Sequence, residues 1–178
     1  MFKISVGNYS ACVERGSLPP MYAEYRERAA LSEEFDVRNA ENEHCFVSVS
    51  NCNDWPKLVV AQTFSPSDAG FDPGLLLALE EKTLFIGAGI RLLAYRLDPP
   101  RRLWEDTCDT GFWNWSQHGE YVLMAAELEF AAWRSNGEKL WTTFVEPPWD
   151  FQVFGDKVHL DVMGHKSSFG IKDGPKRA

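Results

Sequence analysis

The sequence predicts a mainly β fold, an antiparallel meander of repeated units with one helix near its N-terminal end. Short apolar runs separated by turn residues follow one another from Cys45 onward. A pattern recurs at a period of about 37 residues over 83–174, and helical spacing stands out in one segment only. A chain of 178 residues, 44% hydrophobic and 13% aromatic, can form a single domain over 1–178 with a sizeable core.

The first 50 residues are expected to hold a strand and the helix. Apolar and polar residues alternate over 2–6, as on a half-buried strand. Pro19-Pro20 precede a segment, 21–31, in which apolar and aromatic residues recur at helical spacing. This predicts a helix that packs against the sheet.

The middle of the chain is expected to be strand, strand and loop. Residues 46–49 and 57–64 are rich in β-forming side chains. Residues 65–74 combine Ser, Pro, Asp and Gly, which predicts a long loop.

The repeat is supported by several separate matches. Residues 83–98 match 121–136, and a shorter third copy ends with Asp173-Gly174 where the second has Asn136-Gly137. The matched pairs are Leu84/Val122, Ile86/Met124, Ile90/Leu128, Leu92/Phe130, Ala94/Ala132, Tyr95/Trp133, Trp104/Trp141 and Trp113/Trp149. Each unit is expected to contain four short strands, as in 120–126, 128–134, 138–145 and 149–154. Asn136-Gly137 predicts a tight primed hairpin turn, because both residues accept positive φ angles.

Two stretches carry a family resemblance. Ser135–Trp141 and, more loosely, Pro99–Trp104 have a turn followed by Leu-Trp, which resembles the blades of quinoprotein-type (PQQ-like) β-propellers over about 83–174. The resemblance implies propeller-blade-like repeats. A closed propeller needs about four or more blades, and this chain has room for two and a fraction. We therefore expect a curved sheet or a two-sheet sandwich, not a closed propeller, with the N-terminal strand and helix over one edge. The resemblance to these blades does not imply that the protein binds a quinone cofactor.

Charge and composition narrow the class of partner. The net charge of −8 disfavours nucleic acid and favours a partner with a basic surface. The first residues do not resemble a signal peptide, and no apolar run, including the best one at 75–79, approaches the length of a membrane span. The four cysteines form no CxxC pair, which predicts reduced thiols in a cytoplasmic protein. Residues 175–178 are expected to be a tail.

Aromatic crowding suggests the leading hypothesis. Trp113, Trp115 and Trp149 lie in stretches rich in Gly, Pro, Asn and Asp, which predicts loops presenting rings to a partner; the alternative is that the rings close the end of a sheet. Asp150 is next to one ring, and the acidic neighbours are Glu105, Asp106 and Asp109. We expect a non-catalytic protein-binding module, with an immunity or inhibitor role as a narrower form. An uncovered sheet edge would also allow a homodimer.

A small hydrolase-like enzyme or small-ligand binder is the alternative. Glu127 and Glu129 would share one face of a strand, as would His159 and Asp161, giving a carboxylate and histidine pocket. Met163-Gly164 could turn His165 back toward them, yet no metal motif is matched, and we expect neither metal nor cofactor. The sequence has no Gly-x-Ser-x-Gly, no Walker motif and no complete dinucleotide fingerprint.

Overall fold

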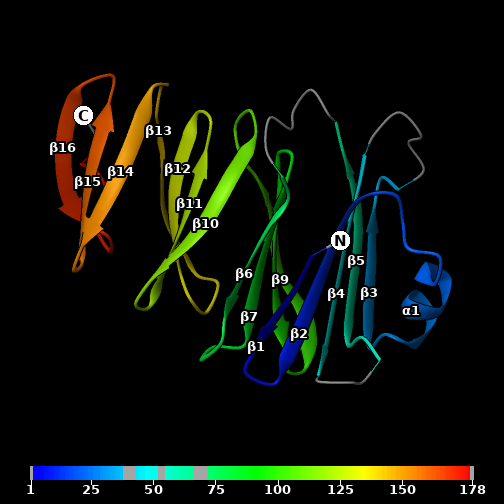
Figure 1. Ribbon diagram of the computed structural model, residues 1–178. Helices are drawn as coiled ribbons and strands as arrows, with labels where there is room; N and C mark the ends of the chain where they lie inside the picture. The colour runs from blue at the N-terminus through cyan, green and yellow to red at the C-terminus, as the bar shows by residue number, and fades with distance from the viewer. Residues whose placement is uncertain (1, 38–42, 52–54, 66–71, 177–178) are drawn as a thin grey trace.

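Four sheets stand side by side in a row, each with one face toward the next (Figure 1). The computed structural model describes residues 2–37, 43–51, 55–65 and 72–176. Sheet A, at the N-terminal end of the row, has the strand order β1 (Phe2–Val6), β2 (Tyr9–Gly16), β4 (Glu43–Asn51), β5 (Leu58–Phe64) and β3 (Leu31–Phe35). All its pairings are antiparallel except β3 with β5.

The other three sheets are simple meanders in chain order. Sheet B holds β6 (Gly74–Ala78), β7 (Thr83–Ala88), β8 (Arg91–Leu97) and β9 (Pro100–Thr107). Sheet C holds β10 (Phe112–His118), β11 (Tyr121–Ala126), β12 (Glu129–Arg134) and β13 (Lys139–Phe144). Sheet D holds β14 (Trp149–Phe154), β15 (Lys157–Val162) and β16 (His165–Gly170). The expected fold of propeller-blade-like β repeats without closure is confirmed. The strands form four separate sheets in an open row, where one curved sheet or a two-sheet sandwich was expected.

Apolar layers between the sheets form the core. Because alternate residues of a strand face opposite ways, Leu84 and Ile86 pack toward sheet A whereas Phe85 packs toward sheet C. A third layer joins sheet C to sheet D, with Phe130 packed near Leu160. Strands β7, β11 and β12 are therefore buried on both faces, which explains why their sequences are almost continuously apolar.

The two equivalent tryptophans of the repeat join successive sheets. Trp104 Nε1 donates a hydrogen bond of 2.6 Å to Gly137 O in sheet C, and Trp141 Nε1 donates one of 2.6 Å to Ile171 O, which follows sheet D. The preceding residues, Leu103 and Leu140, are bulges that have no partner in the strand register. The same linkage at both places confirms that the repeat seen in the sequence is a repeat of structure.

The N-terminal region contains more strands than the sequence suggested. Strands β2 and β3 were missed, and the helix, α1 (Tyr22–Arg28), is shorter than 21–31. Tyr22 and Tyr25 of α1 pack against Phe46 of sheet A at ring-centroid distances of 5.8 and 6.1 Å. No helix in the described part of the chain is long and apolar enough to cross a membrane.

Two local expectations differ from the structure, and most of a third lies outside the described residues. Residues 149–154 open sheet D, so the boundary expected for the four-stranded unit was wrong. Gly137 has a φ of 96° whereas Asn136 has no positive φ, and Gly137 N donates to Arg134 O at 2.9 Å, so the turn exists but is not a primed one. Most of the loop expected over 65–74 lies outside the described residues.

Candidate functional site

One end of sheets B, C and D, the upper end in Figure 1, collects three hairpin turns and both connections between these sheets. We call it the turn end. It comprises the turns at 89–90, 127–128 and 163–164 and the connections 108–111 and 145–148.

Hydrogen bonds tie these turns and connections into one belt. Each connection bonds to the turn of the sheet before it, and each also bonds to the turn that follows. The bonds are Phe112 N to Gly89 O (2.8 Å), Cys108 N to Ile90 O (2.8 Å), Glu127 N to Gly111 O (3.0 Å), Val145 N to Leu128 O (3.1 Å) and Met163 N to Pro148 O (2.9 Å). Trp149 Nε1 adds a bond of 3.1 Å to Glu127 O. A surface held in this way changes little when a partner binds, which lowers the entropic cost of binding.

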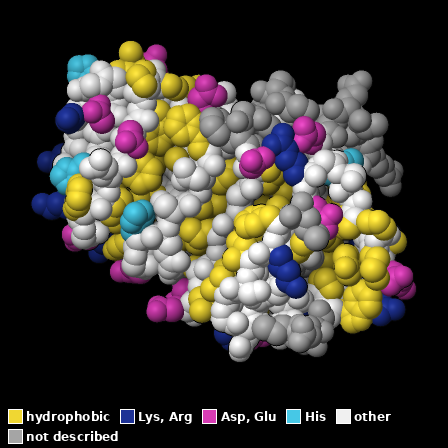
Figure 2. Space-filling view, viewed as in Figure 1, with side chains coloured by type: hydrophobic (Ala, Val, Ile, Leu, Met, Phe, Trp, Pro, Cys, Tyr) yellow, Lys and Arg dark blue, Asp and Glu magenta, His cyan; other side chains and the backbone are white. Residues whose placement is uncertain are grey.

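Large apolar side chains are exposed along this belt. Ile90, Phe144 and Met163 are 43%, 66% and 54% exposed, although they come from three different segments. Pro147 and Pro148 are exposed between Phe144 and Met163. Figure 2 shows hydrophobic and acidic side chains next to one another along the upper margin, over sheets C and D. Exposed apolar groups gathered at one place typically mark a binding surface.

Acidic side chains lie among these apolar ones. Asp109 and Glu146 are exposed, and Glu127 and Glu129 are half-buried. Glu129 is held in place, since its Oε1 accepts from Thr142 Oγ1 at 2.7 Å and its Oε2 from Asp109 N at 3.2 Å. Beneath them, burial raises the pKa of the Cys108 thiol to about 12, with the charge of Glu129 adding to the effect. The turn end therefore presents negative charge.

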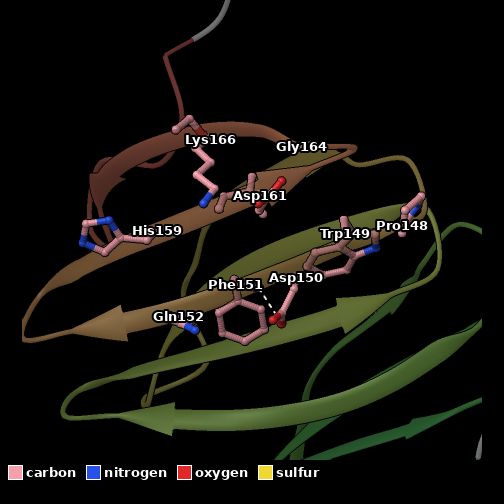
Figure 3. Close-up of a pocket in the computed structure, with 11 residues that line it drawn as sticks. Pro148, Trp149, Asp150, Phe151, Gln152, His159, Asp161, Gly164 and Lys166 are labelled. Atoms are coloured by element: carbon pink, nitrogen blue, oxygen red, sulfur yellow. Dashed lines mark hydrogen bonds between the residues drawn. The ribbon is translucent and has the colours of Figure 1, made fainter.

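A pocket continues the turn end onto the outer face of sheet D (Figure 3). Its volume is about 460 Å³, and all its lining residues belong to 148–167. Asp150, Asp161 and Lys166 are direct neighbours across β14, β15 and β16, so their side chains share the face that points away from sheet C. In Figure 3, Lys166 and Asp161 extend into the same space, with Asp150 beside Trp149. The next row of neighbours is Gln152, His159 and Ser168.

The three tryptophans of the leading hypothesis are not in loops. Trp113 and Trp115 belong to β10 and Trp149 to β14. Trp113 stacks on Trp149 with centroids 5.2 Å apart, in the layer between sheets C and D. Trp115 packs against Phe85 at 5.4 Å, between sheets B and C. The loop prediction was wrong, because the Gly and Pro residues lie just outside these strands, and the rings close the layers between the sheets.

Two of the four acidic residues predicted beside the tryptophans form ion pairs within the protein, and the other two lie at the site. Glu105 contacts Arg91 Nε at 3.2 Å and Arg102 Nη1 at 3.1 Å, and Asp106 contacts Lys139 Nζ at 2.7 Å. These two carboxylates are thus used within the protein. Asp109 lies on the turn end and Asp150 lines the pocket.

The carboxylate and histidine pocket of the alternative hypothesis is assembled only in part. His159 and Asp161 line the pocket, but Glu127 and Glu129 do not. Glu127 lies in the turn between β11 and β12, so it does not share a strand face with Glu129. His165 starts β16 in register with Val162, not with Asp161. Within the described residues, no group of three or more His, Cys, Asp or Glu is placed to hold a metal ion.

Sequence reasoning missed Phe144, Met163, Glu146 and Lys166. The repeat held a usable signal, since Ile90 and Leu128 were already matched and both occupy hairpin turns at the same end of adjacent sheets. Extending that match to the third copy would have placed the turn 163–164 beside them. The peptide bonds Asp98-Pro99 and Pro147-Pro148 are cis, which the sequence alone does not indicate.

Comparison with known proteins places the chain by fold alone. It matches no sequence-family model and no curated protein. The computationally designed Ika8 protein has a TM-score of 0.45 at 12% identity, over 77% of this chain and 45% of that one. Sqt1 of Saccharomyces cerevisiae has 0.44 at 12% identity, over 70% and 38%, and BamB of Moraxella catarrhalis has 0.39 at 11%, over 69% and 38%. The chain thus spans less than half of each of these proteins, and its similarity is a distant one to β-propeller proteins.

Proposed function

We propose that this protein is a non-catalytic protein-binding module whose recognition surface is the turn end together with the pocket of sheet D. The observation that carries the proposal is the hydrogen-bonded belt that presents Ile90, Phe144 and Met163 among carboxylates. Apolar anchors on a rigid support supply contact area, and the surrounding charge selects the partner.

The partner is a protein with a basic surface. Asp109 and Glu146 have no Lys or Arg within ion-pair distance in the described part of the chain, so their charges are available to a partner. In the pocket, Asp150 and Asp161 face each other across β14 and β15 and Lys166 lies beside Asp161, so the two carboxylates exceed the one lysine, and an arginine or lysine side chain of the partner would offset the remaining negative charge. Steering by these charges would speed association at low ionic strength.

An inhibitor or immunity role is a narrower form of this proposal, in which the partner is an enzyme that loses activity when bound. A reducing, cytoplasmic setting belongs to it, supported by the free thiols of Cys12, Cys45 and Cys108. We also propose that sheets B to D are related to quinoprotein-type blades, on the support of the Leu-Trp bulge at Leu103-Trp104 and Leu140-Trp141. A shared type of blade does not imply a shared cofactor, because function depends on the residues of a site and not on the fold.

The test compares the proteins captured from a lysate of the source organism by the unaltered chain and by four double variants, of which two alter the site and two are their matched controls. Phe144→Ser with Met163→Ser removes apolar anchors, and its control is Phe2→Ser with Met21→Ser, of similar type and exposed 53% and 43%. Glu146→Gln with Asp150→Asn removes charge, and its control is Glu24→Gln with Asp156→Asn, exposed and outside the site.

A single basic protein, held by the chain and both controls but lost with both site variants and at high salt, is the expected result. The purified pair should then bind in a calorimeter with the same ranking. Equal binding by site variants and controls would refute the proposal, provided that circular dichroism shows all five proteins folded.

A further inference from the structure

A second cavity, of about 400 Å³, lies at the opposite end of the row, on the outer face of sheet A. Its floor comes from three adjacent strands. Ser10 of β2 is paired with Ser50 of β4, and Cys12 of β2 with Ser48 of β4 and Lys3 of β1. Because alternate residues face opposite ways, these side chains all point away from sheet B, whose contacts use Tyr9, Ala11, Val13, Val47 and Val49.

The cavity has one aromatic wall. Tyr25 of α1 stacks on Phe46 at a centroid distance of 6.1 Å and meets Trp55 at 5.9 Å. Arg28 lies 4.0 Å from the centroid of the Trp55 ring, which fixes that ring although it is 41% exposed. In Figure 2, hydrophobic side chains gather on the right-hand side, where Figure 1 places α1.

Two serine hydroxyls of the floor have no hydrogen bond to a described protein group and are open to the cavity. Ser10 is 8% exposed and Ser48 is 9% exposed, and neither side chain makes a hydrogen bond within the described residues. Both line the cavity. A hydroxyl that no protein group engages can donate to and accept from a ligand, so this floor offers two adjacent hydrogen-bonding groups to whatever enters the cavity.

The lining is neutral as a whole. Lys3 and Glu14 are its two charged residues and cancel each other. Burial raises the pKa of the Cys12 thiol, which therefore stays uncharged at neutral pH. Serine hydroxyls both donate and accept, which suits a ligand whose own groups do the same. An anion would need a surplus of donors and a cation a surplus of carboxylates, and the floor has neither.

We propose that this cavity binds a carbohydrate, with ring hydroxyls on Ser10, Ser48 and Ser50 and an apolar ring face against Trp55 and Tyr25. The ligand is neutral and small. This site is separate from the turn end and does not depend on the proposed protein-binding function.

The test is saturation-transfer NMR with the full chain and a panel of D-glucose, D-mannose, D-galactose and N-acetylglucosamine at millimolar concentration. Free amino acids form a second arm, since Lys3 and Glu14 could instead hold a zwitterion. Signal from at least one sugar and none from the amino acids is expected. Ser48→Ala should weaken sugar binding by about three- to tenfold, as for one lost hydrogen bond, and Trp55→Ala by more.

The thermal midpoint separates a binding role from a structural one. Since the Ser48 hydroxyl has no partner in the protein, Ser48→Ala should leave the midpoint unchanged or raise it. Ser168→Ala, an exposed serine on sheet D, should change neither midpoint nor binding. A panel without any sugar signal, signal from amino acids alone, or sugar binding unaffected by Ser48→Ala would each overturn the proposal.

Discussion

Replacing Gly87 with alanine should destabilise the joint between sheets B and C. Gly74 and Gly87 are register partners on β6 and β7, and the Phe112 ring of sheet C lies over both. A Cβ at Gly87 would stand 2.5 Å from Phe112 Cδ2, and one at Gly74 would stand 2.7 Å from Cε1. Phe112 is 2% exposed and has little room to move. Gly87 has no positive φ, so its backbone conformation does not require glycine. Glycine is needed there because the Phe112 ring occupies the place of a side chain.

The expected cost of Gly87→Ala is about 1–3 kcal/mol, the range for overpacking a filled core. For a chain of this size, 2 kcal/mol corresponds to a lower melting temperature by about 4–8 °C. Gly170→Ala is the control, because its new Cβ would meet only the carboxylate end of Asp173, which can move. Urea unfolding followed by tryptophan fluorescence gives both values.

A double-mutant cycle tests the cause. Phe112→Ala alone should cost about 3–5 kcal/mol. In the presence of Gly87→Ala it should cost less, because the new methyl group fills part of the space that the ring leaves. We expect a coupling of at least about 1 kcal/mol. The reasoning fails if the two costs simply add, or if Gly87→Ala costs no more than Gly170→Ala.

Three further predictions concern single contacts and pH. Trp141→Phe should cost about 1 kcal/mol in chemical unfolding, because it removes the 2.6 Å hydrogen bond to Ile171 O; an unchanged free energy of unfolding would contradict this. Asp150→Asn should stabilise the protein by a few tenths of a kcal/mol at low salt, since Asp150 has Asp161 as its direct cross-strand neighbour and an asparagine Oδ1 can still accept from Phe151 N; a destabilised variant would show that the charge of Asp150 has a structural partner. The free energy of unfolding should fall above about pH 9, because burial raises the pKa of the Cys45 and Cys108 thiols to about 12 and only the unfolded chain then loses these protons. The slope should be about 1.4 kcal/mol per pH unit for each thiol, measured in urea at pH 8–11, and Cys45→Ala should reduce it.

The repeat let much of the fold be read from the sequence. Strands expected over 120–126, 128–134 and 138–145 are observed as β11, β12 and β13. The match of Trp104 with Trp141 proved structural, because both indoles make the same bond to the next sheet. Strand β2 was missed although Tyr9, Ala11 and Val13 alternate with residues of the opposite face. Strand β3 was missed because it pairs in parallel with a strand distant in sequence.

The candidate site was harder to predict. Sequence reasoning found Asp109, Asp150, His159 and Asp161, which the structure places on the turn end or in the pocket. It assigned Trp113 and Trp115 to loops on the strength of nearby Gly and Asn. Whether an aromatic ring faces a partner or fills a layer depends on which sheet lies opposite, and that is not a local property of the chain.

The sequence by itself determined most of the elements: short apolar runs that form strands, hairpin turns between them and a period of about 37 residues. These follow from local propensity and from alternation along each strand. Only the tertiary structure decided that the units separate into four sheets in a row, that Phe112 needs two glycines opposite it, and that Ile90, Phe144 and Met163 share one end. Those facts depend on contacts between segments far apart in the chain, whose formation is governed by packing between sheet faces.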